Sequence, residues 1–277
     1  MQTPQIGLVA IDLDKTLLDE HLQVPERNRE AVAAAAAHGV TVAIATGRTH
    51  ESAARYARQL GIDAPIISYN GAMIRRADED EPMRHVRLDP DLAAEIVETL
   101  VHEMIDFMYF LDGDLYVPRF DHWARGYLAR TGDHPCMAGD MRRFAGASPT
   151  KLLLLGTPEQ TLQRHARFSR EYAGRIYATI SLPPYMEILN PEATKATALR
   201  WLAEHLGVPM ECTVAMGDSL NDLEMVQAAG VGVFMPAADA ELRAHADFVP
   251  TDPRAGVAEA MEALVLAPGA ACKSGEK

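Results

Sequence analysis

Acidic residues stand at the ends of two short apolar segments of the chain. Asp12 and Asp14 come at the end of segment 6–13, and Asp218 follows segment 213–216. Short runs without a polar face are typical of strands buried on both sides of a parallel sheet. Functional groups gather at the carboxyl ends of such strands. We therefore expect the three carboxylates to meet at one site.

This cluster of carboxylates predicts a magnesium site. Neighbouring carboxylates repel one another unless a cation or a proton lies between them. Hard oxygen ligands, with no His or Cys nearby, suit Mg²⁺, which completes its shell with water and phosphate oxygens. We predict Asp12, Asp14 and Asp218 as the metal ligands and Mg²⁺ as the cofactor.

Two further residues supply what a phosphoryl group needs. The hydroxyl of Thr46, which follows segment 40–45, and backbone amides at helix N-termini can hold phosphoryl oxygens. Lys195, at the start of a predicted helix, can neutralise a nucleophile and developing charge; Lys151 competes for this role but is worse placed relative to Asp218. These parts predict phosphoryl transfer through an aspartyl-phosphate.

The elements that must position these residues alternate between strand and helix. At the start of the chain we predict strands 6–13, 40–45 and 66–68, and helices 25–37 and 49–60. After residue 185 we predict helices 194–206, 220–229, 238–245 and 256–264, and strands 213–216, 231–234 and 248–249. This order predicts an α/β fold with a doubly wound, mostly parallel, Rossmann-like sheet.

The middle of the chain has a different pattern and predicts an inserted α+β cap domain. Its predicted helices are 89–103, 122–130 and 159–172, and its predicted strands are 107–111, 115–117, 151–155 and 176–180. The polar segment 75–83 is expected to be an exposed connection. The predicted domains are therefore a core formed by 1–81 and 186–277 and a cap formed by 82–185.

Composition limits the partners and the compartment. The chain has 277 residues and a net charge of −13, which argues against nucleic acid or an anionic membrane as the main partner. The N-terminus lacks a signal-peptide pattern and no segment is apolar enough to span a membrane. Cys136, Cys212 and Cys272 form neither a disulfide framework nor a zinc pattern, so we expect a reduced, cytoplasmic protein. The tail from Ala267 onward is expected to be disordered.

Four motifs together resemble a known enzyme family. They are D-L-D-K-T at 12–16, T-G-R at 46–48, the lone Lys195 and G-D-S-L-N-D at 217–222. In this order, and on predicted strand ends, they resemble the haloacid dehalogenase superfamily of phosphatases, most closely the Cof-type branch with its large inserted α/β cap. The family often has Gly where this chain has Lys15, whose side chain could capture phosphate or point to solvent.

The resemblance implies a role for each residue of the motifs. Asp12 would be the nucleophile. Asp14 would protonate the leaving alcohol and then deprotonate the hydrolytic water, and its backbone carbonyl would bind Mg²⁺ beside the Asp218 carboxylate.

The remaining roles concern the phosphoryl group. Thr46 and the Gly47 amide would hold it, Lys195 would bridge it to the nucleophile, and Asn221 would contact it. Asp222 would orient metal-bound water or Lys195.

The function expected from these residues is a Mg²⁺-dependent phosphatase acting on a small phosphorylated metabolite such as a sugar phosphate. A phosphomutase with the same core and a non-enzymatic phospho-aspartate switch are the alternatives. Asp14 argues against the switch, because an acid/base group is useful only where an ester is cleaved or an intermediate is turned over. The sequence leaves the oligomeric state open.

Overall fold

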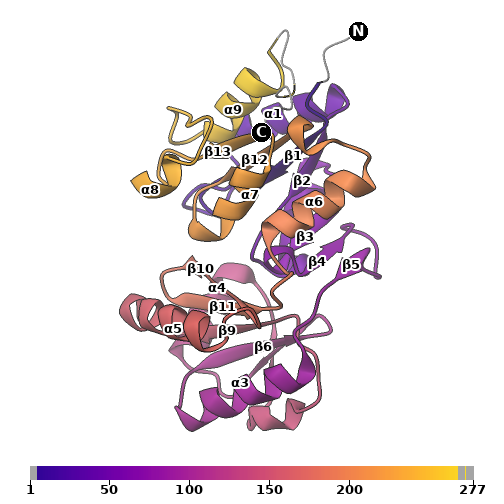
Figure 1. The fold of residues 1–277 in the computed structure, drawn as a ribbon. Coiled ribbons are helices and arrows are strands. Elements are labelled where there is room, and N and C mark those ends of the chain that lie inside the picture. The colour runs from indigo at the N-terminus through magenta and orange to yellow at the C-terminus, as the bar shows by residue number, and fades with distance from the viewer. Residues whose placement is uncertain (1–4, 268–271, 273–277) are drawn as a thin grey trace.

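A computed structural model describes residues 5–267 and Cys272 as two lobes joined by two crossings of the chain (Figure 1). The core lobe holds a four-stranded sheet in the order β13-β12-β1-β2. All its neighbouring strands are parallel, and their bounds are β1 Leu8–Ile11, β2 Thr41–Ile44, β12 Thr213–Gly217 and β13 Val231–Phe234. Each strand is short and apolar because both of its faces are buried.

Helices cover both faces of the core sheet. Val9 and Ile11 point to the face covered by α1 (Glu26–Ala37), α2 (His50–Leu60) and α9 (Gly256–Leu264). Leu8 and Ala10 point to the face covered by α6 (Lys195–His205) and α7 (Leu223–Ala228), and the short α8 (Ala240–Arg243) packs near β13. The predicted doubly wound α/β core is therefore confirmed.

A small antiparallel sheet extends the core toward the second lobe. It consists of β3 (Ile66–Ser68), β4 (Met73–Arg75) and β5 (Arg84–His85), and a parallel bridge between Ala45 and Ile67 attaches it beside β2. The 3₁₀ turn η1 (Tyr69–Gly71) joins β3 to β4. The polar segment 75–83, predicted as a connection between domains, is mostly the turn of the β4–β5 hairpin.

The second lobe is built on a six-stranded sheet in the order β10-β11-β9-β6-β7-β8. The strand bounds are β6 Phe107–Leu111, β7 Asp114–Val117, β8 Pro135–Met137, β9 Lys151–Leu155, β10 Tyr177–Leu182 and β11 Tyr185–Leu189. Helices α3 (Pro90–His102) and α5 (Pro158–Glu171) cover one face. Helix α4 (His122–Thr131) covers the other face, together with Tyr69 and Met73 of the core lobe. Its α+β character agrees with the predicted cap.

The predicted boundary between 185 and 186 falls inside β11. This strand lies between β9 and β10 in the second sheet, so the second lobe continues to Leu189. Pro183 and Pro184 form the tight turn between the paired residues Leu182 and Tyr185. The apolar run at 185–189 continues the sheet because both of its faces are buried.

The prediction that the cysteines form no disulfide is wrong for one pair. Cys212 and Cys272 are bonded, with their Cα atoms 4.5 Å apart, and Cys136 is a free, exposed thiol. Their separation of 60 residues gives no local signal of pairing. The cysteines therefore no longer support a reduced compartment. Most of the tail predicted to be disordered lies outside the described residues.

In the described part of the chain, no helix could cross a membrane. Each helix within residues 5–267 is too short or too polar to cross a bilayer.

Gly71 provides a test of how the core holds the start of α6. It has φ +101°, and an added Cβ would lie 2.2 Å from the carbonyl oxygen of Thr194, the N-cap residue before Lys195. We expect Gly71→Ala to lower the free energy of unfolding by about 3 kcal/mol, because strain in the backbone adds to overpacking. Urea denaturation measures this loss.

Gly61 is the matched control. It also has positive φ, +65°, but nothing lies within 4 Å of the added Cβ. Gly61→Ala should therefore cost only about 1 kcal/mol. Equal losses at the two positions would show that the contact with Thr194 contributes nothing.

Candidate active site

Lys195 joins three elements at the carboxyl edge of the core sheet. Asp12 follows β1, and its backbone N–H donates to the Met216 carbonyl of β12 over 3.0 Å. The Lys195 Nζ donates to Asp12 Oδ1 over 2.7 Å and to Asp222 Oδ1 over 2.5 Å. The lysine is the first residue of α6, where a capping box between Thr194 and Thr197 fixes the helix start. The predicted neighbours Asp12, Lys195 and Asp222 are thus brought together.

Asp222 connects this lysine to the loop that carries Asp218. Its second oxygen, Oδ2, accepts the backbone N–H groups of Asp218 and Ser219, both over 3.0 Å. Asp222 ends the 3₁₀ turn η4 (Leu220–Asp222). Gly217 is required here, because a Cβ on it would lie 2.3 Å from the Cβ of Asp222.

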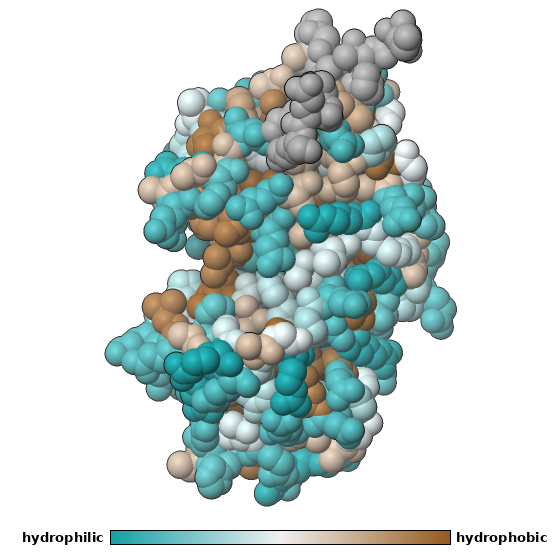
Figure 2. Space-filling model, in the orientation of Figure 1, coloured by the Kyte–Doolittle hydropathy of each residue, from teal (hydrophilic) through white to brown (hydrophobic). Residues whose placement is uncertain are grey.

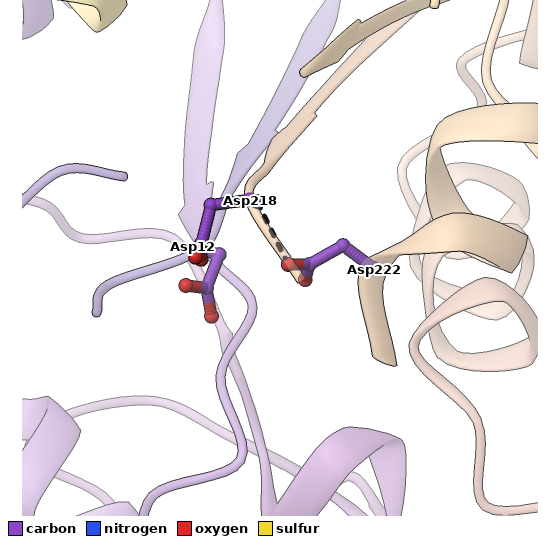
Figure 3. A group of neighbouring side chains, drawn as sticks. All are labelled: Asp12, Asp218 and Asp222. Atoms are coloured by element: carbon purple, nitrogen blue, oxygen red, sulfur yellow. Dashed lines mark hydrogen bonds between the residues drawn. The ribbon is translucent and has the colours of Figure 1, made fainter. Parts of the chain in front are cut away.

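Three buried carboxylates form a group that fits a metal ion. Asp12, Asp218 and Asp222 each offer an oxygen, and these atoms lie within 4.8 Å of one another (Figure 3). The donors are all oxygens, as Mg²⁺ prefers. The carboxylate of Asp14, which the sequence placed near the metal, is not a member of this group.

Burial and neighbouring charges shift the pKa values of the ionisable groups at this edge. Burial raises the pKa of Asp218 to about 6, and Asp222 adds to the rise. Burial also raises the pKa of Asp12, although Lys195 opposes the shift. Burial disfavours the charged form of Lys195, but its two carboxylate partners outweigh that effect and raise its pKa. A bound cation would favour the ionised form of both aspartates.

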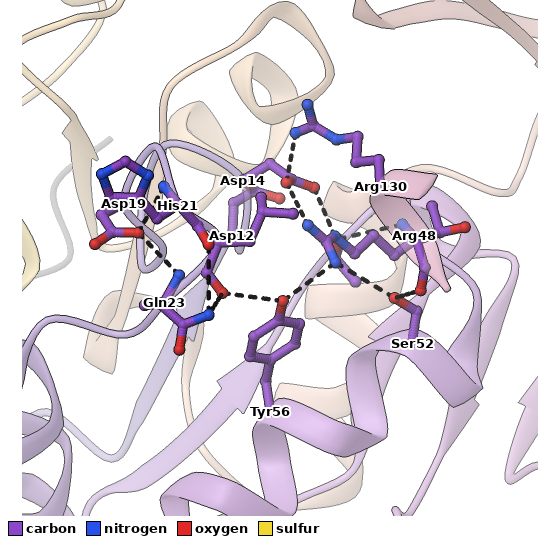
Figure 4. A network of polar contacts seen from close by, with 12 residues as sticks. Asp12, Asp14, Asp19, His21, Gln23, Arg48, Ser52, Tyr56 and Arg130 are labelled. Carbon is purple, nitrogen blue, oxygen red and sulfur yellow. Dashed lines mark hydrogen bonds and ion pairs between the residues drawn. The ribbon is translucent and has the colours of Figure 1, made fainter. Parts of the chain in front are cut away.

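Asp14 faces two arginines from different lobes (Figure 4). Arg48 of the core donates from Nε to Oδ2 over 2.8 Å and from Nη2 to Oδ1 over 2.6 Å. Arg130 of α4 donates from Nη2 to the same Oδ1 over 2.6 Å. Burial alone would raise the pKa of Asp14, but the hydrogen bonds and charges of the arginines hold it below its usual value.

The predicted phosphate-binding residues lie beside this edge. Thr46 is buried, and its hydroxyl accepts the Arg48 backbone N–H over 3.2 Å. Asn221 donates from Nδ2 to Asn70 Oδ1 over 2.9 Å, while its own Oδ1 is buried without a partner among the described residues. A Cβ on Gly47 would lie 3.0 Å from Asn70 Oδ1, so glycine lets Asn70 reach this loop.

A buried ion pair from the second lobe supports the same loop. Lys151 of β9 donates to Glu187 Oε2 of β11 over 2.7 Å and to the carbonyl oxygen of Gly47 over 2.8 Å. Asn70 Nδ2 donates to the same Glu187 oxygen over 3.0 Å. In the sequence, Lys151 competed with Lys195 for the role at the phosphoryl group. In the structure, Lys151 instead connects the second lobe to the core through the Gly47 carbonyl.

Residues of both lobes line one pocket at this junction. Figure 2 shows apolar side chains at the waist between the lobes. The lining includes residues from the core, namely Asp12, Asp14, Thr46, Gly47, Arg48, Asp218, Ser219 and Asn221. It also includes residues from the second lobe, namely Tyr127, Arg130, Thr131, Lys151, Ser181, Leu182, Tyr185 and Glu187.

Sequence reasoning gave no role at the site to the residues of the second lobe, apart from naming Lys151 as a competitor of Lys195. Lys151 and Glu187 carried a signal, because each is a lone charge within an apolar strand and a buried charge needs a partner. Arg130 and Tyr127 carried none. Lys15 has φ +61°, the backbone region that favours glycine, and its exposed side chain lies near enough to oppose the rise in the pKa of Asp218.

Most of the core and the whole second lobe match one family model. The model describes a haloacid dehalogenase-like hydrolase and matches residues 9–261. The chain belongs to this family. The resemblance drawn from the four motifs is thereby confirmed, and the protein is a hydrolase whose named relatives are phosphatases.

Relatives of this hydrolase act on different substrates. It is 29% identical to 5-amino-6-(5-phospho-D-ribitylamino)uracil phosphatase YitU of Bacillus subtilis, covering 82% of this chain and 86% of the relative. It is 27% identical to an HMP-PP phosphatase of Serratia proteamaculans, covering 85% and 86%. The structure of a haloacid dehalogenase-like hydrolase from B. subtilis superposes with a TM-score of 0.84 at 28% identity, covering 94% of this chain and 100% of the other.

The buried pair of this hydrolase predicts a strong loss of stability on removal of one partner. The side chains of Lys151 and Glu187 are 1% and 3% exposed. Lys151→Met should lower the free energy of unfolding by about 3–5 kcal/mol, because Glu187 is left buried and uncompensated. Adding Glu187→Gln should recover part of that loss in urea denaturation.

The exposed pair of Arg175 and Glu95, 52% and 49% exposed, is the control. Arg175→Met should cost less than about 1 kcal/mol. Purely additive costs of Lys151→Met and Glu187→Gln would contradict coupling between the buried charges.

Proposed function

We propose that the protein is a Mg²⁺-dependent phosphatase that hydrolyses a small phosphorylated metabolite through an aspartyl-phosphate intermediate. The observation that carries this proposal is the position of Asp12. Its carboxylate faces the ammonium group of Lys195 and lies beside Asp218 in a pocket covered by the second lobe. A carboxylate held by a cation at a strand end is suited to covalent catalysis.

In the first step, an oxygen of Asp12 forms a bond to phosphorus and the ester P–O bond breaks. Asp14 gives a proton to the departing alcohol oxygen. Lys195 balances charge on Asp12 and on the phosphoryl oxygens, and Thr46 and the Gly47 amide hold the transferring group. The arginines favour the ionised form of Asp14. Before it can protonate the leaving oxygen, Asp14 therefore has to leave the arginines and take up a proton from solvent.

In the second step, Asp14 takes a proton from water as the water oxygen attacks phosphorus. The bond between phosphorus and the Asp12 oxygen breaks, inorganic phosphate leaves and both carboxyl groups return to their starting states. The same residue thus serves as acid and then as base.

The carboxylates of Asp12 and Asp218 and the backbone carbonyl of Asp14 would hold Mg²⁺. The ion would supply positive charge to the phosphoryl oxygens. Asp222 belongs to the buried triad, but its two oxygens already accept from Lys195 and from two backbone N–H groups. We therefore assign it to positioning Lys195 and the Asp218 loop.

The substrate class follows from the relatives, whose names give small phosphorylated metabolites as substrates. A phosphomutase would use the same core, and an assay of released phosphate against isomerised product separates the two activities. Phosphate esters are charged and cross membranes poorly, so a cytoplasmic location remains our prediction on that ground alone.

The nucleophile is tested by replacing its attacking oxygen. Asp12→Asn should lower kcat for phosphate release by at least about 1,000-fold while the fold is retained, because the amide is nearly isosteric but not nucleophilic. Asp63→Asn, which alters a fully exposed carboxylate, is the control and should leave kcat unchanged. Turnover near the wild-type rate in Asp12→Asn would contradict the mechanism.

The metal is tested by removal and replacement. Activity should vanish in EDTA and return with Mg²⁺, and Asp218→Asn should raise the Mg²⁺ concentration needed by at least about tenfold. Mg²⁺ should also raise the melting temperature of the wild-type protein, which does not depend on turnover. Full activity in chelator, or recovery with Zn²⁺ alone, would exclude this site.

A further inference from the structure

Helix α4 presents one face to the pocket. Tyr127, Arg130 and Thr131 all line it, and their spacing of three and four residues places them on the same side of the helix. The end of α4 is docked on the core, since Ser52 Oγ donates to the Thr131 carbonyl over 3.3 Å. Arg130 is therefore held at the site by a rigid element.

The guanidinium of Arg130 adds a second positive charge beside Asp14, whose own charge is already balanced by Arg48. Arg48 already binds both oxygens of Asp14, and Arg130 shares one of them. Two cations thus face one carboxylate, and their side chains are only 5% and 30% exposed. Removing charge from water is costly unless an opposite charge compensates it.

The pocket contains no other carboxylate that could serve Arg130. Among the described residues that line it, Asp12 faces Lys195 and Glu187 faces Lys151, while Asp218 is the proposed metal ligand. When Asp14 turns to the leaving oxygen, as the proposed function requires, both arginines lose their shared partner. A negative charge must then come from the bound molecule.

The position of Arg130 places the negative charge of the bound molecule on the leaving group, that is, on the alcohol portion of the substrate. The residues proposed to hold the transferring phosphoryl group all come from the core, whereas α4 covers the pocket from the other lobe. Beside Arg130, the Tyr127 hydroxyl is buried and has no hydrogen-bond partner within the described residues. The ring of Tyr127 packs edge-on against Tyr185, with centroids 5.7 Å apart. This side of the pocket thus offers a cation, a hydroxyl donor and aromatic walls.

We propose that Arg130 is a specificity-determining residue that binds a second anionic group on the substrate. The substrate class is then phosphate monoesters whose alcohol portion carries a carboxylate or a second phosphate. The anion takes the place of Asp14 at the guanidinium, so that binding of the correct substrate frees Asp14 for the leaving oxygen. This inference rests on the proposed phosphatase activity.

The test compares matched pairs of substrates by the ratio of their kcat/KM values. Two pairs differ by a carboxylate: 3-phosphoglycerate with glycerol 3-phosphate, and 6-phosphogluconate with glucitol 6-phosphate. A third differs by a phosphate: fructose 1,6-bisphosphate with fructose 6-phosphate. The wild-type protein should favour the anionic member of at least one pair by tenfold or more. The pair that shows this preference identifies the anion.

Arg130→Met should reduce that preference by at least tenfold, mainly through KM, and Arg130→Lys should retain part of it. Arg125→Met is the control, because Arg125 lies on the same helix but is exposed. It should leave the preference unchanged. If Arg130 served only to hold the lobes together, its replacement would lower kcat/KM equally for both members of a pair. The ratio of the two values would then be unchanged.

An assay with p-nitrophenyl phosphate distinguishes failure of the inference about Arg130 from failure of the proposed phosphatase activity. If Mg²⁺ and the wild-type protein release phosphate from it, but no pair shows a preference for the anion, the inference about Arg130 is wrong. It is equally wrong if the preference survives in Arg130→Met. If no phosphate is released from any of the compounds, the proposed function itself fails.

Discussion

The active site depends on one buried ammonium group. Lys195 is fully buried and balances two carboxylates, Asp12 at 2.7 Å and Asp222 at 2.5 Å. These three side chains come from the end of β1, the start of α6 and the turn η4, so the ion pairs fix three elements at once. Without the lysine, like charges would be buried together, which is costly. The remaining negative charge of the carboxylate triad is what makes a divalent cation a good partner.

The two lobes are joined by two kinds of charged contact, with different consequences. Lys151 and Glu187 of the second lobe are almost fully buried and pair with each other, and they bind the Gly47 carbonyl and Asn70 of the core, which suits a permanent junction. Arg130 is partly exposed and shares Asp14 with Arg48, so its contact is easier to exchange. A single carboxylate between two guanidinium groups leaves positive charge in the pocket. The first contact positions the Gly47 loop, which we propose binds the phosphoryl group, and the second leaves room for recognition of the substrate.

Local patterns predicted the core well because its strands are short apolar runs bounded by breakers. The predicted strand at 231–234 and helix at 256–264 have the observed bounds. The strand β8 was missed because Pro135–Met137 has no alternating pattern and is largely exposed. Residues 186–189 were placed in the core because nothing local distinguishes a strand of one sheet from a strand of another. Sheet membership depends on pairing partners that are distant in sequence.

The resemblance to the family placed Asp222 beside Lys195. The sequence by itself determined that Asp12 and Asp218 stand at strand ends and would therefore meet. Parallel strands align their carboxyl ends, so this follows from topology alone. Only the tertiary structure decided that the Asp14 carboxylate faces Arg130 and that Cys212 reaches Cys272. Such contacts join segments whose separation in the sequence carries no periodic signal. They depend on how the cap packs on the core and on where the chain returns, which only the packing of side chains between distant elements determines.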